Sequence, residues 1–419
     1  MMKQTTDLLI IGGGASGLAA AVAARRFFPA VSVCVAEQNH RVGKKILATG
    51  NGRCNLGNDG SGTPNNPYSG TMCKYIPEIW KNTKDSVAFF RELGIIVRHE
   101  EDGRLYPSSN QAASVLDALR ITVEQEDVFL HCDSRVTNIT PKKSGFSVQI
   151  GDESWTAEAL LFSTGGLAAP KTGSDGCAFP ILSRLGCKMT QMQPALVPVE
   201  TDPGLLRFLK GVRVPGVVKA LSKSETELAA EQGEIQFTPH ALSGICVMNL
   251  TAKCAESDLK WIEANLFPQD TGEQMEAILW ELYAVRAQWK LEDWLTGLLP
   301  KKAGMQLLRS CGILLPFDAP VYRVNAEELK NLAYLCQHWR FPVWGRGTWN
   351  EAQVTAGGIS VQSVKRDLQA SFCPGIFFAG EILDVHGICG GFNLDWAWRS
   401  GQYAGKNAAS WILQKRIGG

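Results

Sequence analysis

The stretch Asp7-Leu8-Leu9-Ile10-Ile11-Gly12-Gly13-Gly14-Ala15-Ser16-Gly17 decides the fold, because it is typical of a strand, a tight glycine turn and the start of a helix. Gly12, Gly14 and Gly17 occupy the three positions of the G-x-G-x-x-G fingerprint. The first glycine permits the turn, the second lets a pyrophosphate approach bare backbone, and the third lets the helix pack close to the strand. The N-terminal amides and dipole of the helix expected from Ala15 to about Phe28 can then hold an anion.

A second predicted strand, over 31–36, ends at Glu37, twenty residues beyond Gly17. A carboxylate at this position can accept hydrogen bonds from both hydroxyls of an adenosine ribose, and it would repel a 2′-phosphate. A glycine fingerprint alone is weak evidence. Here the strand, the helix, the second strand and the acid follow in the required order, so we interpret the segment as a dinucleotide site rather than a chance match.

Composition limits the classes of function. The 419 residues are 45% hydrophobic and 20% charged with a formal net charge of +1, which is ordinary for a globular protein and gives no electrostatic case for nucleic acid or an anionic membrane. No apolar run reaches the roughly 18 residues that span a bilayer. Twelve cysteines without a C-x-x-C pair or zinc-type spacing favour neither a disulfide framework nor a metal site. The first strand leaves no room for a signal peptide, so we expect a reducing cytoplasm.

The pattern of expected secondary structure changes twice along the chain. Residues 1–190 have an α/β pattern, short strand-like segments follow from about 191, and Trp, Leu and charged residues recur at helical spacing over 254–312. The α/β pattern returns near Gln353. We therefore expect an inserted domain, partly β and partly helical, between two halves of one α/β domain.

The end of the chain distinguishes between cofactors. An apolar strand, Pro374 to Glu381, ends in Gly-Glu and is followed by Gly390-Gly391-Phe392-Asn393 and a predicted helix from about Leu394. In FAD proteins the acid of such a strand can hydrogen-bond the ribityl chain or pyrophosphate, and the helix start can place amides at the pyrimidine edge of the flavin. A domain that binds only NAD has no need of this second segment, so the sequence favours FAD.

With these motifs in place, the chain resembles the bacterial FAD-binding flavoproteins described as NAD(FAD)-utilising dehydrogenases, aminoacetone-oxidase-like or BaiN-like proteins. The resemblance covers nearly the whole chain and rests on Ile11–Gly17, Gly43–Asn55 (GKKILATGNGRCN), Phe237–Gly244 (FTPHALSG), Ala352–Ser360 (AQVTAGGIS) and Gly375–Gly401 (GIFFAGEILDVHGICGGFNLDWAWRSG). It implies an α/β fold in which a discontinuous Rossmann-type FAD domain, 1–190 and 350–419, carries an inserted β-barrel-like domain, 191–253 and 313–349, with a helical subdomain, 254–312. The chain departs from the family pattern at Phe392, Asp395 and Arg399, so a relative's substrate is not carried over to it.

The motifs and the resemblance together assign a set of residues to FAD. We expect contacts from Gly12, Gly14, Ala15, Ser16, Gly17, Glu37, Gln38, Lys44, Lys45, Gly52, Arg53, Cys54, Asn55, Val136, Thr164, Gly165, Gly166, Gly380, Glu381, Gly391, Phe392 and Asn393. The alternatives are plain structural turns for the glycines, an exposed acid at Glu37 and strand packing at Val136. For Cys54 the alternative of a small buried hydrophobe is favoured, because no second cysteine lies at redox spacing.

Three residues are candidates for acid–base chemistry. His386 and Asp384 lie in the C-terminal flavin segment, and His240 lies in the inserted domain. A histidine titrates near neutrality and can protonate a substrate at the flavin ring. The alternative is a hydrogen-bonded structural role, which for His240 is equally favoured. His386 is favoured over His240 for catalysis, because its neighbours are predicted flavin contacts.

The resulting hypothesis is an FAD-dependent oxidoreductase that reduces a small apolar unsaturated or carbonyl substrate, such as a steroid-like enone. Only one dinucleotide fingerprint is present, so NADH or NADPH would bind transiently at the flavin face. One alternative is an amine oxidase that returns electrons to dioxygen. Another is a non-catalytic flavin sensor or an accessory protein of RNA modification. The sequence carries no signal for an oligomeric state.

Overall fold

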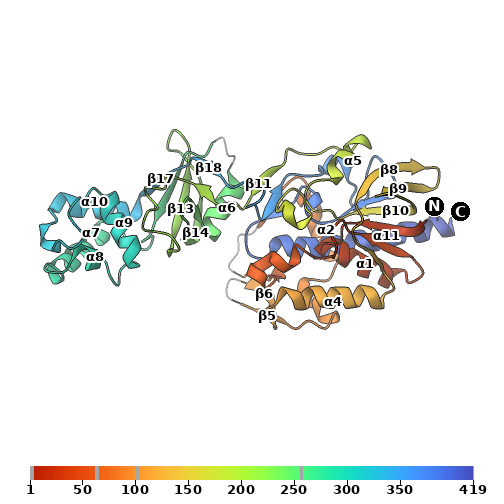
Figure 1. Ribbon diagram of the computed structural model, residues 1–419, viewed down its shortest axis with the longest axis horizontal. Helices are drawn as coiled ribbons and strands as arrows, with labels where there is room; N and C mark the ends of the chain where they lie inside the picture. The colour runs from red at the N-terminus through yellow and green to blue at the C-terminus, as the bar shows by residue number, and fades with distance from the viewer. Residues whose placement is uncertain (1–3, 62–65, 101–102, 255–257, 419) are drawn as a thin grey trace. The chain divides into compact units, whose positions relative to one another are not determined.

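The computed structural model describes residues 4–61, 66–100, 103–254 and 258–418, and the chain forms two compact units (Figure 1). The first is discontinuous and comprises Met1–Pro194 and Ala352–Gly419, whereas the second is the continuous segment Ala195–Glu351. Each unit has its own buried apolar core. The further division of the second unit into a barrel and a helical subdomain stays a prediction.

The first unit is built on a sheet of strand order β7-β2-β1-β10-β9-β8, in which β20 also pairs with β10. Four strands run parallel: β1 (Gln4–Ile11), β2 (Val33–Ala36), β10 (Glu153–Phe162) and β20 (Ile376–Phe378). Their apolar runs are almost fully buried, as expected for strands covered on both faces. The register aligns the ends of these strands, so their carboxyl ends meet at one edge of the sheet.

The remaining strands of this sheet extend it on both sides. Strand β7 (Phe129–His131) is parallel to β2, and the hairpin of β8 (Val136–Lys142) and β9 (Gly145–Ile150) continues from β10 in antiparallel order. The strand predicted before Glu381 is therefore confirmed as β20, which returns to the sheet more than two hundred residues after β10.

Two helices, α1 (Ala15–Phe27) and α11 (Phe392–Ile417), pack along each other in the first unit. Glycines make the close approach possible, because a Cβ at Gly401 would lie 2.4 Å from the carbonyl oxygen of Ser16 and one at Gly405 would lie 2.2 Å from that of Ala20. Helix α4 (Ala112–Gln125) contacts α1, and Figure 1 shows both on the same side of β8, β9 and β10.

The other elements of the first unit are short. They are the 3-10 turns η1 (Ile46–Gly52), η2 (Cys73–Tyr75), η4 (Pro170–Thr172), η6 (Val361–Ser363) and η7 (Gly380–Ile382), the helices α2 (Ile76–Lys81), α3 (Ser86–Glu92) and α5 (Ala178–Arg184), and the strands β3 (Gly57–Asn58), β4 (Tyr68–Ser69), β5 (Val97–His99), β6 (Arg104–Pro107), β19 (Val354–Ala356) and β21 (His386–Gly387).

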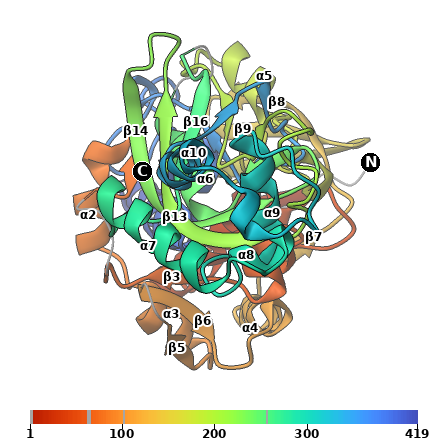
Figure 2. The same ribbon diagram turned by 90° about the vertical axis from the view of Figure 1, so that its left-hand side faces the viewer.

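The second unit holds an antiparallel seven-stranded sheet of order β17-β16-β13-β14-β15-β12-β18, whose long strands β13 and β14 are seen in Figure 2. Buried aromatic side chains of Phe237, Trp339 and Phe341 pack in its core. Helices α7 and α10 contact each other, and each begins with a capping box, at Thr271 and at Asn325, that fixes its start. The elements are β12 (Val199–Glu200), β13 (Arg213–Leu221), β14 (Glu227–Phe237), β15 (Ala241–Ser243), α6 (Ile245–Lys253), β16 (Trp261–Asn265), α7 (Gly272–Val285), α8 (Leu291–Trp294), α9 (Lys301–Ser310), η5 (Val321–Arg323), α10 (Ala326–Gln337), β17 (Trp339–Pro342) and β18 (Gly345–Arg346).

Among the helices that the structure describes, none combines the length and the apolar character that crossing a membrane requires.

Candidate flavin site

A pocket opens in the first unit where the parallel strands end. Ile11, Ala36 and Phe162 are the last residues of β1, β2 and β10, and all three line it. In open α/β sheets ligands bind in the crevice outside the carboxyl ends of the strands. The position of the pocket therefore follows from the topology of the sheet.

The glycine turn forms one wall of this pocket. Gly12 has φ +105°, and a Cβ there would lie 2.6 Å from the carbonyl oxygen of Ser163. Gly14 is the N-cap of α1, and a Cβ on it would meet nothing within 4 Å, so it borders open space. No side chain caps α1, which leaves its first amides available to an anionic ligand. Gly17 has a packing role, since a Cβ on it would lie 2.0 Å from the carbonyl oxygen of Gly12.

Glu37 presents a fixed carboxylate to the pocket. Its Oε2 accepts a hydrogen bond of 2.8 Å from the amide of Gly13. Its Oε1 accepts from the amide of Asn39 at 2.8 Å and from Nδ2 of the same residue at 2.6 Å. Two carboxylate oxygens offer about four acceptor sites, so one remains beyond these three bonds for a ribose hydroxyl.

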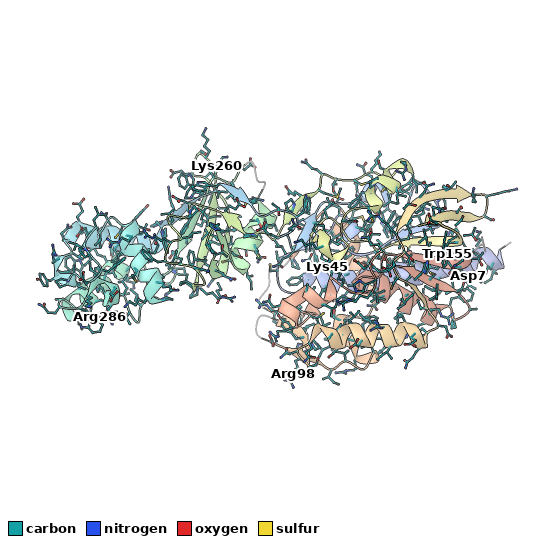
Figure 3. The ribbon with its side chains drawn as sticks, viewed as in Figure 1. Asp7, Lys45, Arg98, Trp155, Lys260 and Arg286 are labelled. Atoms are coloured by element: carbon teal, nitrogen blue, oxygen red, sulfur yellow. The ribbon has the colours of Figure 1, made fainter. Side chains whose placement is uncertain are left out.

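Lys45 and Glu381 meet in the pocket wall. Nζ of Lys45, labelled in Figure 3, lies 2.6 Å from Oε2 of Glu381 and also donates to the carbonyl oxygen of Ala168 at 3.2 Å. Oε1 of Glu381 accepts from the amide of Thr355 at 2.9 Å. The pair thus places one positive and one negative group where the predicted pyrophosphate and ribityl chain would run.

The start of α11 closes the C-terminal side of the pocket. Asn393 accepts a hydrogen bond from the amide of Gly387 at 2.8 Å and donates to its carbonyl oxygen at 2.9 Å, which clamps the preceding loop. Trp396 donates from Nε1 to the carbonyl oxygen of Gly380 at 3.1 Å, and Ser400 accepts from the amide of Gly380 at 2.9 Å. These bonds fix the backbone beside Glu381.

Two buried polar atoms test whether the pocket suits a dinucleotide. Oε1 of Gln38 and Oγ1 of Thr164 belong to pocket-lining residues, are sealed from solvent and have no hydrogen-bond partner among the described residues. Buried polar groups in native proteins are nearly always paired, so such atoms indicate a polar ligand. Together with the open helix terminus and the Glu37 carboxylate, they fit FAD.

The pocket brings together just over half of the residues assigned to FAD from the sequence. Those that line it are Gly12, Gly14, Ala15, Ser16, Glu37, Gln38, Lys44, Lys45, Val136, Thr164, Gly165, Glu381 and Asn393. Those that do not line it are Gly17, Gly52, Arg53, Cys54, Asn55, Gly166, Gly380, Gly391 and Phe392. Gly380 acts through the backbone bonds described above.

Arg53, which the sequence analysis assigns to FAD, does not line the pocket. Its guanidinium lies 3.9 Å above the ring of Tyr106, donates to Oδ1 of Asn110 from Nε at 3.0 Å and from Nη2 at 2.7 Å, and pairs with Glu100. These partners hold the charge away from the pocket. Neighbouring Cys54 is fully buried, and burial raises the pKa of its thiol to about 12, so it stays neutral.

The three candidate acid–base residues are not brought together in the pocket. Asp384 is buried, and its Oδ2 accepts from the amide of Thr71 at 3.0 Å and from Oγ1 of Thr71 at 2.8 Å, so its carboxylate has a structural role. His386 is buried in β21, which pairs with β4. His240 belongs to the second unit, in the turn between β14 and β15, and its side chain is exposed.

Several residues that line the pocket were not assigned to FAD from the sequence. They come from loops and from the start of α11, and include Asn39, Gly43, Thr49, Ser134, Arg135, Ser163, Gly173, Ser174, Gln353, Leu394, Trp396 and Ala397. The prediction of a contact at Val136 could have been extended to Ser134 and Arg135, which precede it. Gln353 lies in the motif Ala352–Ser360, whereas for Ser174 the sequence offers no comparable signal.

Comparison with known proteins identifies the family of the chain. The family model of the HI0933-like protein Rossmann domain matches residues 6–407. A 3-dehydro-bile acid delta(4,6)-reductase of Clostridium scindens is 32% identical over 408 residues, which cover 96% of this chain and 98% of that protein. Ribosomal RNA dihydrouridine synthases of Haemophilus influenzae and Escherichia coli are 27% and 28% identical, covering 95% and 94% of this chain and 97% and 96% of theirs.

Solved structures share the fold. A 3-ketosteroid-delta4-(5alpha)-dehydrogenase of Rhodococcus jostii has a TM-score of 0.50 at 15% identity, covering 97% of both chains. A quinol-fumarate reductase has a TM-score of 0.52 at 12% identity, covering 99% of this chain and 72% of that one. The predicted family and enzyme class are confirmed: the chain belongs to the HI0933-like Rossmann-domain family, and it is an FAD-dependent oxidoreductase.

Proposed function

We propose that the protein reduces a carbon–carbon double bond conjugated to a carbonyl group in an apolar, steroid-like substrate, with NADH or NADPH as the reductant. The observation that carries this proposal is the 32% identity, over 96% of the chain, to a protein named as a bile acid delta(4,6)-reductase. The pocket supports it because its residues suit the cofactor that such a reduction needs.

The chain's own residues bind and orient the cofactor. FAD, when bound, supplies the hydride-transfer chemistry. Gly14 and the first amides of α1 would hold the pyrophosphate, and Glu37 would hold the ribose. Lys45 and Glu381 fix the middle of the site through their ion pair, and Asn393 keeps the Gly387 backbone in place next to it.

The proton that completes the reduction needs a donor. We propose His386, because it lies in the same unit as the flavin pocket and directly follows Val385, which lines that pocket. The backbone of its strand is fixed by the pairing of β21 with β4.

A second candidate is reduction of uridine in RNA, favoured by the two ribosomal RNA dihydrouridine synthases at 27% and 28% identity. The uracil ring also carries a double bond conjugated to a carbonyl, so the flavin chemistry would be the same. The net charge of +1 favours the small substrate, because RNA binding depends on neutralising many phosphates. We also place the protein in a reducing cytoplasm, since its twelve cysteines are all free, and in a bacterium, since the three relatives named above are bacterial.

The experiment that tests this function is steady-state turnover of the purified holoenzyme without oxygen. NADH or NADPH is supplied with a 3-oxo-4-ene steroid, and products are analysed by mass spectrometry. We expect a product two mass units heavier than the steroid supplied. One molecule of NADH or NADPH should be oxidised for each molecule of product. A reduced uridine in ribosomal RNA, with the steroid untouched, would favour the second candidate. Peroxide release on amine addition in air would instead indicate an oxidase.

A further inference from the structure

A second cavity of about 770 Å³ lies in the first unit, outside the flavin pocket. Its apolar wall is made by Tyr68, Trp80 and Phe392, and its polar wall includes Asp395 and Arg399; we call it the Arg399 cavity. This volume falls within the roughly 300–1,000 Å³ typical of small-molecule sites. Different faces of the first turns of α11 line the two sites, so the helix lies between them.

Arg399 is held in a fixed plane in this wall. Only 13% of its side chain is exposed, and its guanidinium carbon lies 4.7 Å from the centre of the Trp80 ring. Nε lies 3.1 Å from Oδ2 of Asp395, which in turn accepts a hydrogen bond of 2.6 Å from Oγ of Ser86 through Oδ1. Stacking on one face and an ion pair on one edge orient the guanidinium before any ligand arrives.

The opposite edge of the guanidinium faces the cavity. Nη1 and Nη2 of Arg399 make no hydrogen bond to any residue that the structure describes. Neither nitrogen is among the sealed polar atoms that lack a partner, so both are reached from the cavity. Two parallel N–H groups on a planar fork match the two oxygens of a carboxylate, and such bidentate pairs are strong and specific.

The other charged residues of the cavity limit the charge of the anion that it can bind. Asp85 and Asp59 also line the cavity, and Oδ2 of Asp59 lies 2.9 Å from Nδ1 of His99. A doubly charged phosphate would be repelled by these carboxylates together with Asp395. The same carboxylates repel any anion in proportion to its charge, so an anion with a single carboxylate is disfavoured least. Its carboxylate would pair with Arg399, and its apolar ring would lie against the aromatic wall.

We propose that the Arg399 cavity is a binding site for a monocarboxylic acid with an apolar or aromatic ring body, separate from the flavin pocket. Arg399 recognises the carboxylate, Asp395 positions Arg399, and Tyr68, Trp80 and Phe392 bind the ring. The site concerns a ligand other than the flavin, and its test measures binding alone, so its failure leaves the proposed reduction untouched.

The test is ¹⁹F NMR of 4-fluorophenylacetate added to the FAD-loaded full chain. The neutral 4-fluorophenylacetamide and the cationic 4-fluorophenethylamine serve as matched probes. The proposal expects the acid to bind about tenfold or more tighter than either, because a site built to pair with a carboxylate rejects a ligand that lacks it.

Variants connect this binding to the residues. Arg399→Gln alone would leave a buried Asp395 charge unpaired and could unfold the protein, so D395N/R399Q, which removes both charges, accompanies it. Each variant is accepted only with the flavin spectrum and Tm of the folded protein. We expect the double variant to lose acid binding about tenfold or more. Arg120→Gln, which removes an exposed arginine of α4, is expected to retain it.

The proposal is overturned by any of four results. They are equal binding of acid and amide, preference for the amine, unchanged acid binding in D395N/R399Q, and no binding of the acid at ~1 mM, which corresponds to less than ~4 kcal/mol of affinity.

Discussion

Lys45 and Glu381 form an ion pair across 336 residues of sequence, with Nζ 2.6 Å from Oε2. The pair joins the loop that follows the first βαβ segment to the 3-10 turn η7, which directly follows the returning strand β20. Both side chains are partly buried, and both line the pocket. The two halves of the flavin site are therefore tied together by a contact inside the site itself.

Replacing Glu381 with Gln should weaken FAD binding. The change removes the charged acceptor that we expect to bond the ribityl chain of FAD, and hydrogen bonds to charged groups contribute about 1.5–3 kcal/mol, so Kd should rise about 10- to 100-fold. Titration of the apoprotein with FAD, followed by quenching of flavin fluorescence, measures it. Glu124→Gln on the exposed face of α4 is the matched control and should leave Kd unchanged. Equal affinity in both variants would remove the pair from the site.

Cys54 should be inert in the native protein. Its thiol has a pKa of about 12 against the ordinary 9.0, because burial disfavours the thiolate. Iodoacetamide at pH 8 should label Cys54 only after unfolding, as read by peptide mass spectrometry. The raised pKa also has a linkage consequence. The stability it contributes is complete below pH 9 and declines as the pH rises towards 12, since only the unfolded state releases the proton there. Fast labelling of the native thiol would show that it is accessible.

Gly405→Ala should destabilise the first unit. The new Cβ would lie 2.2 Å from the carbonyl oxygen of Ala20, so α1 and α11 must separate, at a cost of about 1–3 kcal/mol. Urea unfolding followed by far-UV circular dichroism gives the change. Lys406→Ala, at the next and exposed position, should stay within about 0.5 kcal/mol of the parent. Wild-type stability of Gly405→Ala is the result that this packing does not allow.

The two histidines should separate by phenotype. His386→Ala is expected to lower kcat about 100-fold or more with FAD still bound, because it removes the proposed proton donor beside the pocket-lining Val385. His240→Ala, at an exposed position of the second unit, should leave kcat and Tm unchanged. Steady-state kinetics and thermal unfolding of both variants decide the matter. A folded, flavin-loaded His386→Ala with unchanged kcat would remove His386 from the mechanism.

Local sequence predicted the local structure well. The helix expected from Ala15 to about Phe28 is α1, and the strand expected before Glu37 is β2. Each depends on neighbours in the chain, so periodicity and glycine spacing suffice. Helix α11 begins at Phe392 rather than at Leu394, because Gly391 adopts φ +103° as its N-cap.

Contacts between residues far apart in the sequence could not be predicted from it. Arg53 was assigned to FAD because it lies in a glycine-rich loop. In the structure its guanidinium stacks on Tyr106 and bonds to Asn110 and Glu100. Nothing in the sequence indicates that these three side chains converge on it. Lys45 and Glu381 were each assigned to the cofactor, whereas their pairing depends on the sheet that brings their segments together.

The most direct test of the account is a single turnover of the reduced holoenzyme. The protein is reduced with dithionite, freed of oxygen and mixed in a stopped-flow instrument with a 3-oxo-4-ene steroid or with its saturated ketone. We predict that the oxidised flavin spectrum returns with the enone, in proportion to the 4,5-dihydro product, and not with the saturated ketone. A flavin that stays reduced with the enone, yet reoxidises when air is admitted, would contradict the proposed reduction of a conjugated double bond.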